Sequence, residues 1–475
     1  MTRLSTILAL TLLAAPALAD KAADDAASRA LARDVFKQLI EINTSESGGG
    51  STPAALAMAE RFRAAGFTDS DIAIVGDDPR KLNLVVRLKG TGKAKPIAMI
   101  GHLDVVEARR EDWTTDPYQF IEKDGFFYGR GTSDMKDGDA ILVATLIRLK
   151  KEGFKPPRDL ILALTADEET AGANGIDWLV HHRRDLIDSE FILNHDGYGV
   201  TMQHGKVLGI YVGLSEKIYA DFELTVRNKG GHSSEPTPDN AIYELAHALA
   251  RLGDYHFPWE LNDAVRLSFE RQIPTAEPET AAMLKGVLAN PPDPAAVARF
   301  NAQPIFYGLT HTTCVATRLL AGHANNALPQ MASANVNCRI LPGHEPEAIR
   351  QELIRVFNEP KLVVRYYDDF GKIHDTAESK HGFATPIVRP DLMKAVETVS
   401  ATMWPGAPVI PNMDSATSDA AMAAPSGIPV YAVAGNAGDI DDTRAHGQDE
   451  RTPVDGFYRG VDFYYRFLKV LLSQH

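Results

Sequence analysis

The sequence predicts an α/β fold in which a large mixed-sheet domain is interrupted by a smaller α+β domain. Strand and helix patterns alternate along the N-terminal part, and the middle of the chain has the order strand, helix, strand, strand, helix, strand. Alternating strands and helices favour a sheet covered on both faces. The βαββαβ order favours a compact four-stranded sheet with two helices on one face.

The N-terminal segment resembles a secretory signal. Arg3 is followed by an apolar run over residues 4–15, and Ala17, Leu18 and Ala19 form a small-x-small cleavage site. We therefore expect residues 1–19 to be a signal peptide, cleaved after Ala19. A membrane anchor or a buried first helix is the alternative, but the run is short for a bilayer span. The mature protein is expected to be secreted, and periplasmic if the source is a Gram-negative bacterium.

The larger domain is expected to comprise residues 20–213 and 381–475. Its first part is predicted from apolar periodicity and from turn residues. The predicted elements are helices at 22–43, 52–65, 139–152 and 175–182, and strands at 83–89, 96–100, 159–166 and 191–194. After residue 386 the α/β pattern resumes, with a strand at 430–433 and a final helix at 456–472.

The smaller domain is expected at residues 214–380. Its predicted elements are strands at 218–226, 312–319, 332–341 and 361–367, and helices at 240–252 and 346–357. A polar, proline-rich stretch at 258–304 is interpreted as an insertion with some helix. Residues 368–384 are polar and loop-like.

Composition limits the classes of partner. The 475 residues are 44% hydrophobic and 24% charged, as in ordinary soluble proteins large enough for two domains. The formal net charge of -14 argues against nucleic acid or an anionic membrane as the main partner. The two cysteines, Cys314 and Cys338, lie in strand-like segments, and either a disulfide or two buried thiols fits the sequence.

Metal-ligand residue types follow the predicted strands, where sites form in open α/β sheets. His102 ends an apolar strand, and Asp104 lies on the same side two residues later. A carboxylate near an imidazole commonly holds the nitrogen that does not bind metal. Asp134 follows a glycine-rich turn and precedes a predicted helix, so a helix cap is its alternative interpretation.

Acidic residues and histidines follow three further segments. Asp167, Glu168 and Glu169 end a buried strand, where such charges are costly unless a cation compensates them. Asp196 follows another strand, and the adjacent His195 is a competing ligand, although neighbouring strand residues point in opposite directions. The last segment contributes His446 near the C-terminus.

The combined set contains two histidines and three carboxylates, which is enough for two metals that share one carboxylate. Nitrogen and oxygen ligands without thiolate favour zinc, with cobalt or manganese as alternatives. Such metals polarise a carbonyl and lower the pKa of a bound water.

These segments resemble the metallopeptidase family that includes aminoacylase-1, carboxypeptidase G, succinyl-diaminopimelate desuccinylase and carnosine dipeptidase. The motifs GHLDVV, DGFFYGRGTSDMK, ADEETAG and AHGQDE carry the resemblance over nearly the whole mature chain. It implies a mixed-sheet, zinc-peptidase-like catalytic domain. The implied roles are bridging ligand for Asp134, one metal for His102 and Asp196, the other for Glu169 and His446, general base for Glu168, and orientation of His102 for Asp104.

The same resemblance implies that the inserted domain is a ferredoxin-like lid, often used for homodimerisation. His232 would help to stabilise the oxyanion, Asn326 would lie near the substrate, and Arg339 would hold the substrate carboxylate. The implied substrate is a peptide C-terminus or a dipeptide. An N-acyl amino acid is the alternative, and an inactive binding or scaffold protein is a further one. An unfamiliar loop at 434–439 leaves side-chain preference open, and the long insertion at 258–304 leaves the mode of dimerisation open.

Overall fold

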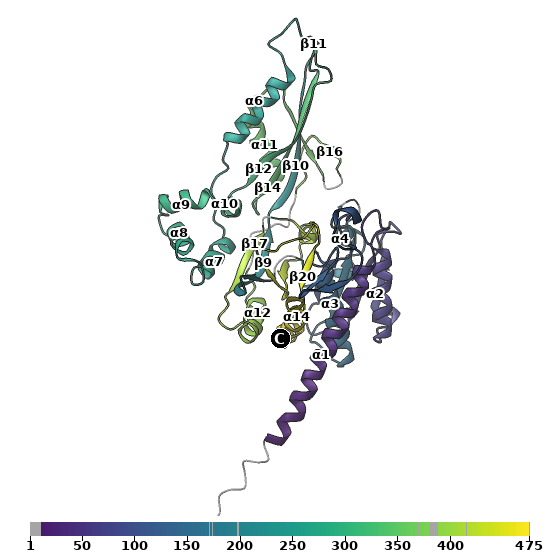
Figure 1. The fold of residues 1–475 in the computed structure, drawn as a ribbon. Helices are drawn as coiled ribbons and strands as arrows, with labels where there is room; N and C mark the ends of the chain where they lie inside the picture. The colour runs from purple at the N-terminus through teal and green to yellow at the C-terminus, as the bar shows by residue number, and fades with distance from the viewer. Residues whose placement is uncertain are drawn as a thin grey trace, which may run out of the picture. The chain divides into compact units, whose positions relative to one another are not determined.

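The computed structural model describes residues 11–170, 172, 174–196, 199–368, 371–379, 388–414 and 416–474. The chain divides into two compact units (Figure 1). Unit 1 contains Met1–Ile210, Pro390–Val409 and Ala432–His475, and unit 2 contains Tyr211–Arg389 and Ile410–Tyr431. The segment Ile410–Tyr431 thus groups with unit 2, although the sequence places it in the larger domain. The reason is packing, because Met413 belongs to a hydrophobic cluster of unit 2.

Most strands of unit 1 belong to one mixed sheet. In spatial order its strands are β1 (Ile72–Val75), β2 (Asn83–Leu88), β6 (Leu160–Thr165), β3 (Ile97–His102), β7 (Phe191–Asn194), β18 (Val430–Val433), β9 (Lys206–Glu216), β8 (Val200–Gln203) and β19 (Ala437–Asp439), with β17 (Val409–Asp414) paired to β9. Strands β6, β3 and β7 run parallel to one another and are buried along their whole length. Their uninterrupted apolar runs match this burial. Their carboxyl ends therefore meet at one edge of the sheet.

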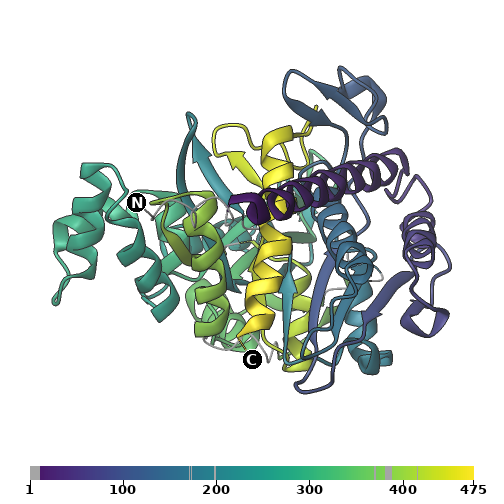
Figure 2. The same cartoon turned by 90° about the horizontal axis from the view of Figure 1, so that it is seen from below.

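Long helices pack around this sheet. Helix α14 (Val454–Ser473) packs against α3 (Lys136–Lys151) and α12 (Pro390–Met403), and α1 (Thr11–Glu41) packs against α3 and α14 (Figure 2). The remaining helices of unit 1 are α2 (Thr52–Ala64), α4 (Gly175–His182), α5 (Arg184–Ile187), and the 3-10 turns η1 (Asp69–Asp71) and η2 (Arg110–Asp112). Helix α1 begins earlier than the predicted helix, so the expected cleavage point after Ala19 lies within it. Residues 1–10 of the expected signal lie outside the described residues.

Within the described part of the chain, no helix is both long and apolar enough to cross a bilayer.

A small antiparallel sheet brings two distant loops of unit 1 together. Its strands are β4 (Ile121–Lys123), β5 (Phe126–Tyr128) and β20 (Arg451–Pro453), in the order β20-β5-β4. Tyr128 pairs with Arg451. The loop that follows β5 and the loop that precedes β20 consequently lie side by side.

Unit 2 is built on an antiparallel sheet. Its strands, in spatial order, are β12 (Thr313–Ala321), β14 (Met331–Ile340), β10 (Ile218–Arg227), β15 (Val363–Tyr367) and β16 (Ile373–His374). Alternate residues of β10 and β14 are buried in one hydrophobic core with α6 (Ala241–Asp254) and α11 (Pro346–Phe357). The predicted βαββαβ order of elements is present, and the short β16 is added within the stretch predicted to be a loop.

The rest of unit 2 includes the insertion. Its elements are α7 (Asp263–Gln272), α8 (Pro278–Leu288), α9 (Pro294–Asn301), α10 (Pro304–Thr310), the ribbon of β11 (Gly231–His232) and β13 (Ala327–Leu328), α13 (Asp419–Ala423) and η3 (Ala424–Ser426). The insertion is therefore helical, and its helices share an apolar cluster with Leu341 and Met413 of unit 2. Cys314 and Cys338 lie directly opposite each other on β12 and β14 and form a disulfide, which decides between the two alternatives that the sequence left open.

Candidate metal centre

The candidate ligands gather where three parallel strands end. His102 is the last residue of β3, Glu169 follows β6 by four residues, and Asp196 follows β7 by two residues. Because parallel strands present their carboxyl ends at the same edge, these side chains are brought to one place. Asp134 and His446 come from the two loops that the small sheet holds together.

The five side chains form two groups that share Asp134. The Nε2 atom of His102 lies 3.1 Å from Oδ1 of Asp134. The Nε2 atom of His446 lies 3.0 Å from Oδ2 of Asp134 and 3.0 Å from a carboxylate oxygen of Glu169. In each group, His102 with Asp134 and Asp196, and Asp134 with Glu169 and His446, the potential ligand atoms lie within 4.8 Å of one another. The two oxygens of Asp134 thus face different histidines, as a bridging carboxylate requires.

The loop that carries Asp134 is held by a buried carboxylate that the sequence did not single out. One oxygen of Glu450 accepts the backbone N–H of Ser133 (2.8 Å), its hydroxyl (2.9 Å) and the N–H of Asp134 (3.1 Å). The other oxygen accepts from Arg130 (2.6 Å) and from the N–H of Gly131 (3.0 Å). Since Glu450 is fully buried, these donors replace the water that the charge has lost.

Arg130 connects the same loop to the segment of His446. Its guanidinium donates to the carbonyls of His446 (3.4 Å) and Gly447 (3.2 Å), and it lies over the ring of Trp113. Arg130 lies in the motif DGFFYGRGTSDMK, and Glu450 lies in the motif AHGQDE. Residue type and spacing, however, could not distinguish them from surface charges.

Asp104 contacts the turn of Glu168 and Glu169 as well as His102, whereas only the contact with His102 was expected. Its main-chain carbonyl accepts from Nδ1 of His102 at 3.1 Å, while its carboxylate lies 3.8 Å from that nitrogen. The carboxylate accepts the backbone N–H groups of Glu168 (3.1 Å) and Glu169 (3.0 Å). Because a carbonyl only accepts, Nδ1 carries a proton, so Nε2 is the nitrogen that contacts Asp134 and that would bind a metal after losing its own proton. Asp104 therefore fixes both His102 and the turn that contains Glu168.

His195, the competing candidate, points into the core. Its side chain is 3% exposed and its ring packs against Tyr464 at 5.1 Å. Burial lowers the pKa of His195 to about 4. Asp196, one residue later, joins the group of His102 and Asp134 instead. The alternation expected along a strand end explains this division.

The electrostatics of the centre suit divalent cations. Burial opposes a charge on His102, but its hydrogen bond to Asp134 and the nearby Glu168 outweigh this and raise its pKa. Hydrogen bonds to Asp134 and Glu169 raise the pKa of His446 to about 10. The pKa of Asp134 is lowered, since the two imidazoles outweigh its desolvation. The negative charge of these carboxylates stabilises protons on both histidines, and the same charge would stabilise bound metal cations. The nitrogen and oxygen donors fit zinc.

The other predicted residues lie in unit 2. His232 and Asn326 are neighbours at the β11–β13 ribbon, where the Asn326 carbonyl accepts the N–H of Ser233 at 3.1 Å. Nδ1 of His232 accepts the Ser234 N–H, so its Nε2 carries the proton. Arg339, near the end of β14, donates to the Thr417 hydroxyl at 3.0 Å and lies over a tyrosine ring.

Comparisons with known proteins identify a family and a similar fold. The model of "Peptidase family M20/M25/M40" matches residues 98–470. Probable carboxypeptidase S-like 2 of Dictyostelium discoideum is 28% identical over 82% of this chain and 74% of its own length. The N-fatty-acyl-amino acid synthase/hydrolase PM20D1 of Xenopus tropicalis is 25% identical over 79% and 72%. The M20 family metallo-carboxypeptidase Sso-CP2 from Sulfolobus solfataricus has a similar fold, with a TM-score of 0.69 at 18% identity over 93% of this chain and 99% of that one.

Proposed function

Because this chain belongs to peptidase family M20/M25/M40, we propose that it is an exported carboxypeptidase or dipeptidase that uses two zinc ions. The observation that carries the proposal is the position of Asp134 between His102 and His446, with one carboxylate oxygen toward each. His102, Asp134 and Asp196 would hold one ion, and Asp134, Glu169 and His446 the other. When bound, the two ions polarise a carbonyl and lower the pKa of a water.

The protein's own groups supply the remaining steps. Glu168 takes the proton from the attacking water and passes it to the leaving nitrogen. His232 donates its Nε2–H to the developing oxyanion, and Asn326 lies near the substrate. Arg339 binds a free α-carboxylate through its planar fork of donors. The substrate is therefore a dipeptide or the C-terminus of a peptide.

Metal removal and a Glu168 variant test this assignment. Purified mature protein should stop hydrolysing its best substrate when a chelator is added, and zinc should restore the activity. Recovery with cobalt or manganese but not with zinc would identify a different native metal. Glu168→Gln should bind two metals and turn over about 10²–10⁴-fold more slowly. Wild-type turnover in this variant would refute the role of Glu168, and full activity without metal would refute the class.

The second candidate is hydrolysis of N-acyl amino acids, which the names of the PM20D1 relatives favour. Both reactions use the same metals and base, so a substrate panel must decide. It should contain dipeptides, N-acetyl amino acids, long-chain N-acyl amino acids, and the C-terminal amide of each. Under either candidate, the wild type should hydrolyse the free acids and not the amides, and Arg339→Met should have a raised KM for the free acids. Equal rates for acid and amide would refute carboxylate binding.

Export is supported by the N-terminal pattern and by the disulfide. Cys314 and Cys338 are the protein's two cysteines, and stable disulfides are typical of oxidising compartments. Mass spectrometry of the protein from the periplasm or culture medium should find a new N-terminus at Asp20. Intact Met1 on the active protein would refute cleavage.

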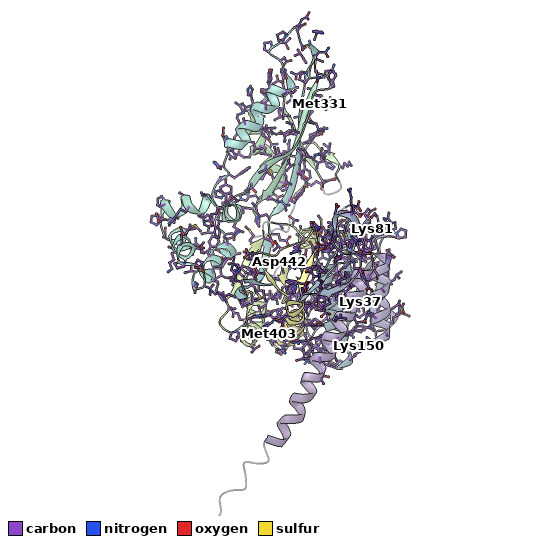
Figure 3. The ribbon with its side chains drawn as sticks, viewed as in Figure 1. Lys37, Lys81, Lys150, Met331, Met403 and Asp442 are labelled. Carbon is purple, nitrogen blue, oxygen red and sulfur yellow. A yellow bond between two sulfur atoms is a disulfide. The ribbon has the colours of Figure 1, made fainter. Side chains whose placement is uncertain are left out.

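Homodimerisation through unit 2, a lid in this proposal, is supported by its sheet edge. Among the described residues β12 pairs only with β14, and Leu319 and Leu320 on it are each 62% exposed. Met331, on the neighbouring strand, is also exposed (Figure 3). An unprotected edge of this kind favours pairing with another strand. Sedimentation should show a dimer that Leu319→Lys dissociates, whereas a wild-type monomer would refute the proposal.

A further inference from the structure

The turn that carries Glu168 and Glu169 has an unusual first residue. Asp167 has a φ of 63°, in the left-handed region that disfavours residues other than glycine. Its side chain is almost wholly buried, and the Thr170 hydroxyl donates to its carboxylate. Such a conformation persists only where its surroundings hold it in place.

Lys81 supplies the charge that holds it. Its Nζ lies 2.7 Å from Asp167 and 3.0 Å from Glu46, and its side chain is only 13% exposed. Burial opposes the charge on Lys81, but the hydrogen bonds to these two carboxylates outweigh it and raise its pKa. Lys81, which Figure 3 labels, comes from the segment just before β2, so its contact with Asp167 joins two separate parts of unit 1.

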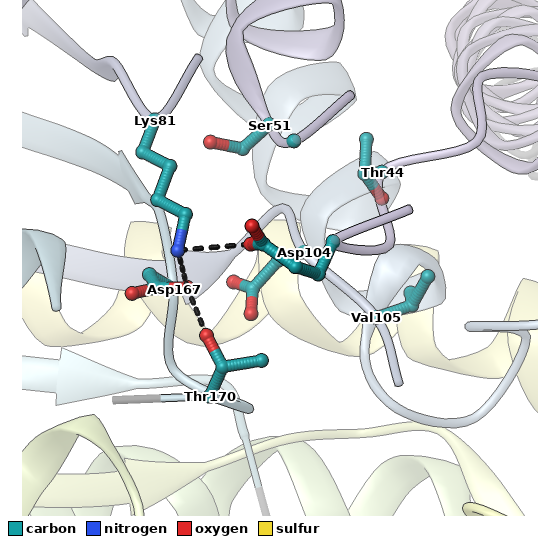
Figure 4. Close-up of a pocket in the computed structure, with 9 residues that line it drawn as sticks. Thr44, Ser51, Lys81, Asp104, Val105, Asp167 and Thr170 are labelled. Carbon is teal, nitrogen blue, oxygen red and sulfur yellow. Dashed lines mark hydrogen bonds and ion pairs between the residues drawn. The ribbon is translucent and has the colours of Figure 1, made fainter. Parts of the chain in front are cut away.

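The contact lies in a small pocket behind the turn. Its walls include Thr44, Ser51, Lys81, Asp104, Asp167 and Thr170, and Figure 4 shows the lysine extending toward the carboxylates. Among the residues that line this pocket in the described part of the chain, Lys81 is the only cation. Three carboxylates, those of Glu46, Asp104 and Asp167, also line it. Asp104, on the same pocket, accepts the backbone N–H groups of Glu168 and Glu169. Removing the ammonium would take away the one cation that the carboxylates of Asp167 and Glu46 both contact.

We infer that Lys81 is a positioning residue, which acts through Asp167 to hold the general base Glu168 and the metal ligand Glu169 in their working geometry. This inference rests on the proposed function for the roles of those two glutamates. Small displacements of a catalytic group are costly, and about 1 Å corresponds to roughly a hundredfold in rate. Lys81 does not contact substrate in this account, so KM should be unaffected.

The test compares Lys81→Met with Lys81→Arg and a matched control. The control is Lys89→Met, which removes a lysine at the other end of β2 that pairs with buried Asp71 at 3.0 Å. Lys81→Met should lower kcat about tenfold to a hundredfold with KM nearly unchanged. Lys81→Arg should restore most of kcat, and Lys89→Met should match the wild type. A kcat for Lys81→Met within about twofold of the wild type, or an equal loss in Lys89→Met, would overturn the inference.

Binding of Co²⁺ alone provides a readout that does not need turnover. Lys81→Met should still bind two Co²⁺ ions but with an altered visible spectrum and weaker binding of one ion, whereas Lys89→Met should match the wild type. If the wild type hydrolysed no substrate, the proposed function would fail, and an unchanged cobalt spectrum in Lys81→Met would separately overturn this inference. If Lys81→Met did not fold, Asp167→Asn should show the same spectral change, and a wild-type spectrum in it would overturn the inference.

Discussion

Replacing Glu450 with glutamine should destabilise unit 1 strongly without introducing a clash. The substitution keeps the shape of the side chain, but it turns one acceptor oxygen into an NH₂ group. One carboxylate oxygen accepts from Arg130 and Gly131, and the other accepts from Ser133 and Asp134. Either orientation of the amide therefore places an NH₂ group against at least two buried or part-buried donors that lose their acceptor.

The magnitude follows from those contacts. A hydrogen bond to a charged group contributes about 1.5–3 kcal/mol, and removing one partner of a buried ion pair costs about 3–5 kcal/mol. We therefore expect Glu450→Gln to lower the free energy of unfolding by about 3–5 kcal/mol. The control is Glu122→Gln, which removes an exposed pair with Arg33 and should cost about 0–1 kcal/mol.

Urea unfolding with a chelator present measures this difference, because bound metal would add its own stabilisation. Tryptophan fluorescence is a suitable signal, since Trp113 lies against the Arg130 guanidinium at 5.1 Å and Trp178 and Trp404 also belong to unit 1. A loss for Glu450→Gln no larger than that for Glu122→Gln would refute the idea that this carboxylate holds the Asp134 loop.

Further predictions concern the disulfide and the histidines. Cys314→Ser with Cys338→Ser should lower the free energy of unfolding of unit 2 by about 3 kcal/mol, given the sequence separation of 24, and an unchanged denaturant midpoint would contradict this. Zinc binding at pH 8 should release a proton from His446, whose pKa without metal is about 10. Calorimetry in buffers of different ionisation heat measures this release. No release would mean that the histidine was already neutral. For the same reason, His446 should contribute its full stabilisation to the metal-free protein below about pH 6.5 and should lose it as the pH rises through about 10. Urea midpoints measured over this pH range would detect the loss.

The parts of the fold that repeat a simple period were predictable. Buried strands such as β7 and amphipathic helices such as α11 were found at the predicted residues, because apolar spacing determines their burial. Three candidate ligands, His102, Glu169 and Asp196, were predictably brought together, since parallel strands bring their ends to one edge.

Contacts that depend on the meeting of distant segments were not predictable. Nothing in the spacing of Lys81, Arg130 or Glu450 distinguishes them from surface charges. Asp167 lies 86 residues from Lys81, and Glu450 lies 320 residues from Arg130. The grouping of residues 410–431 with unit 2 has a related cause, because Met413 belongs to unit 2 through packing rather than through sequence continuity. Local periodicity contains no information on such pairings.

The Arg130–Glu450 pair joins residues 320 positions apart, and it closes the loop on which both candidate metal groups depend. Contacts of such high contact order form late, because their loop-closure entropy must be met before they add stability. A partly folded chain would therefore offer scattered ligands and no complete centre. Metal ions would then bind almost exclusively the native state, and their supply would control how much of the protein survives proteolysis as well as how fast it works.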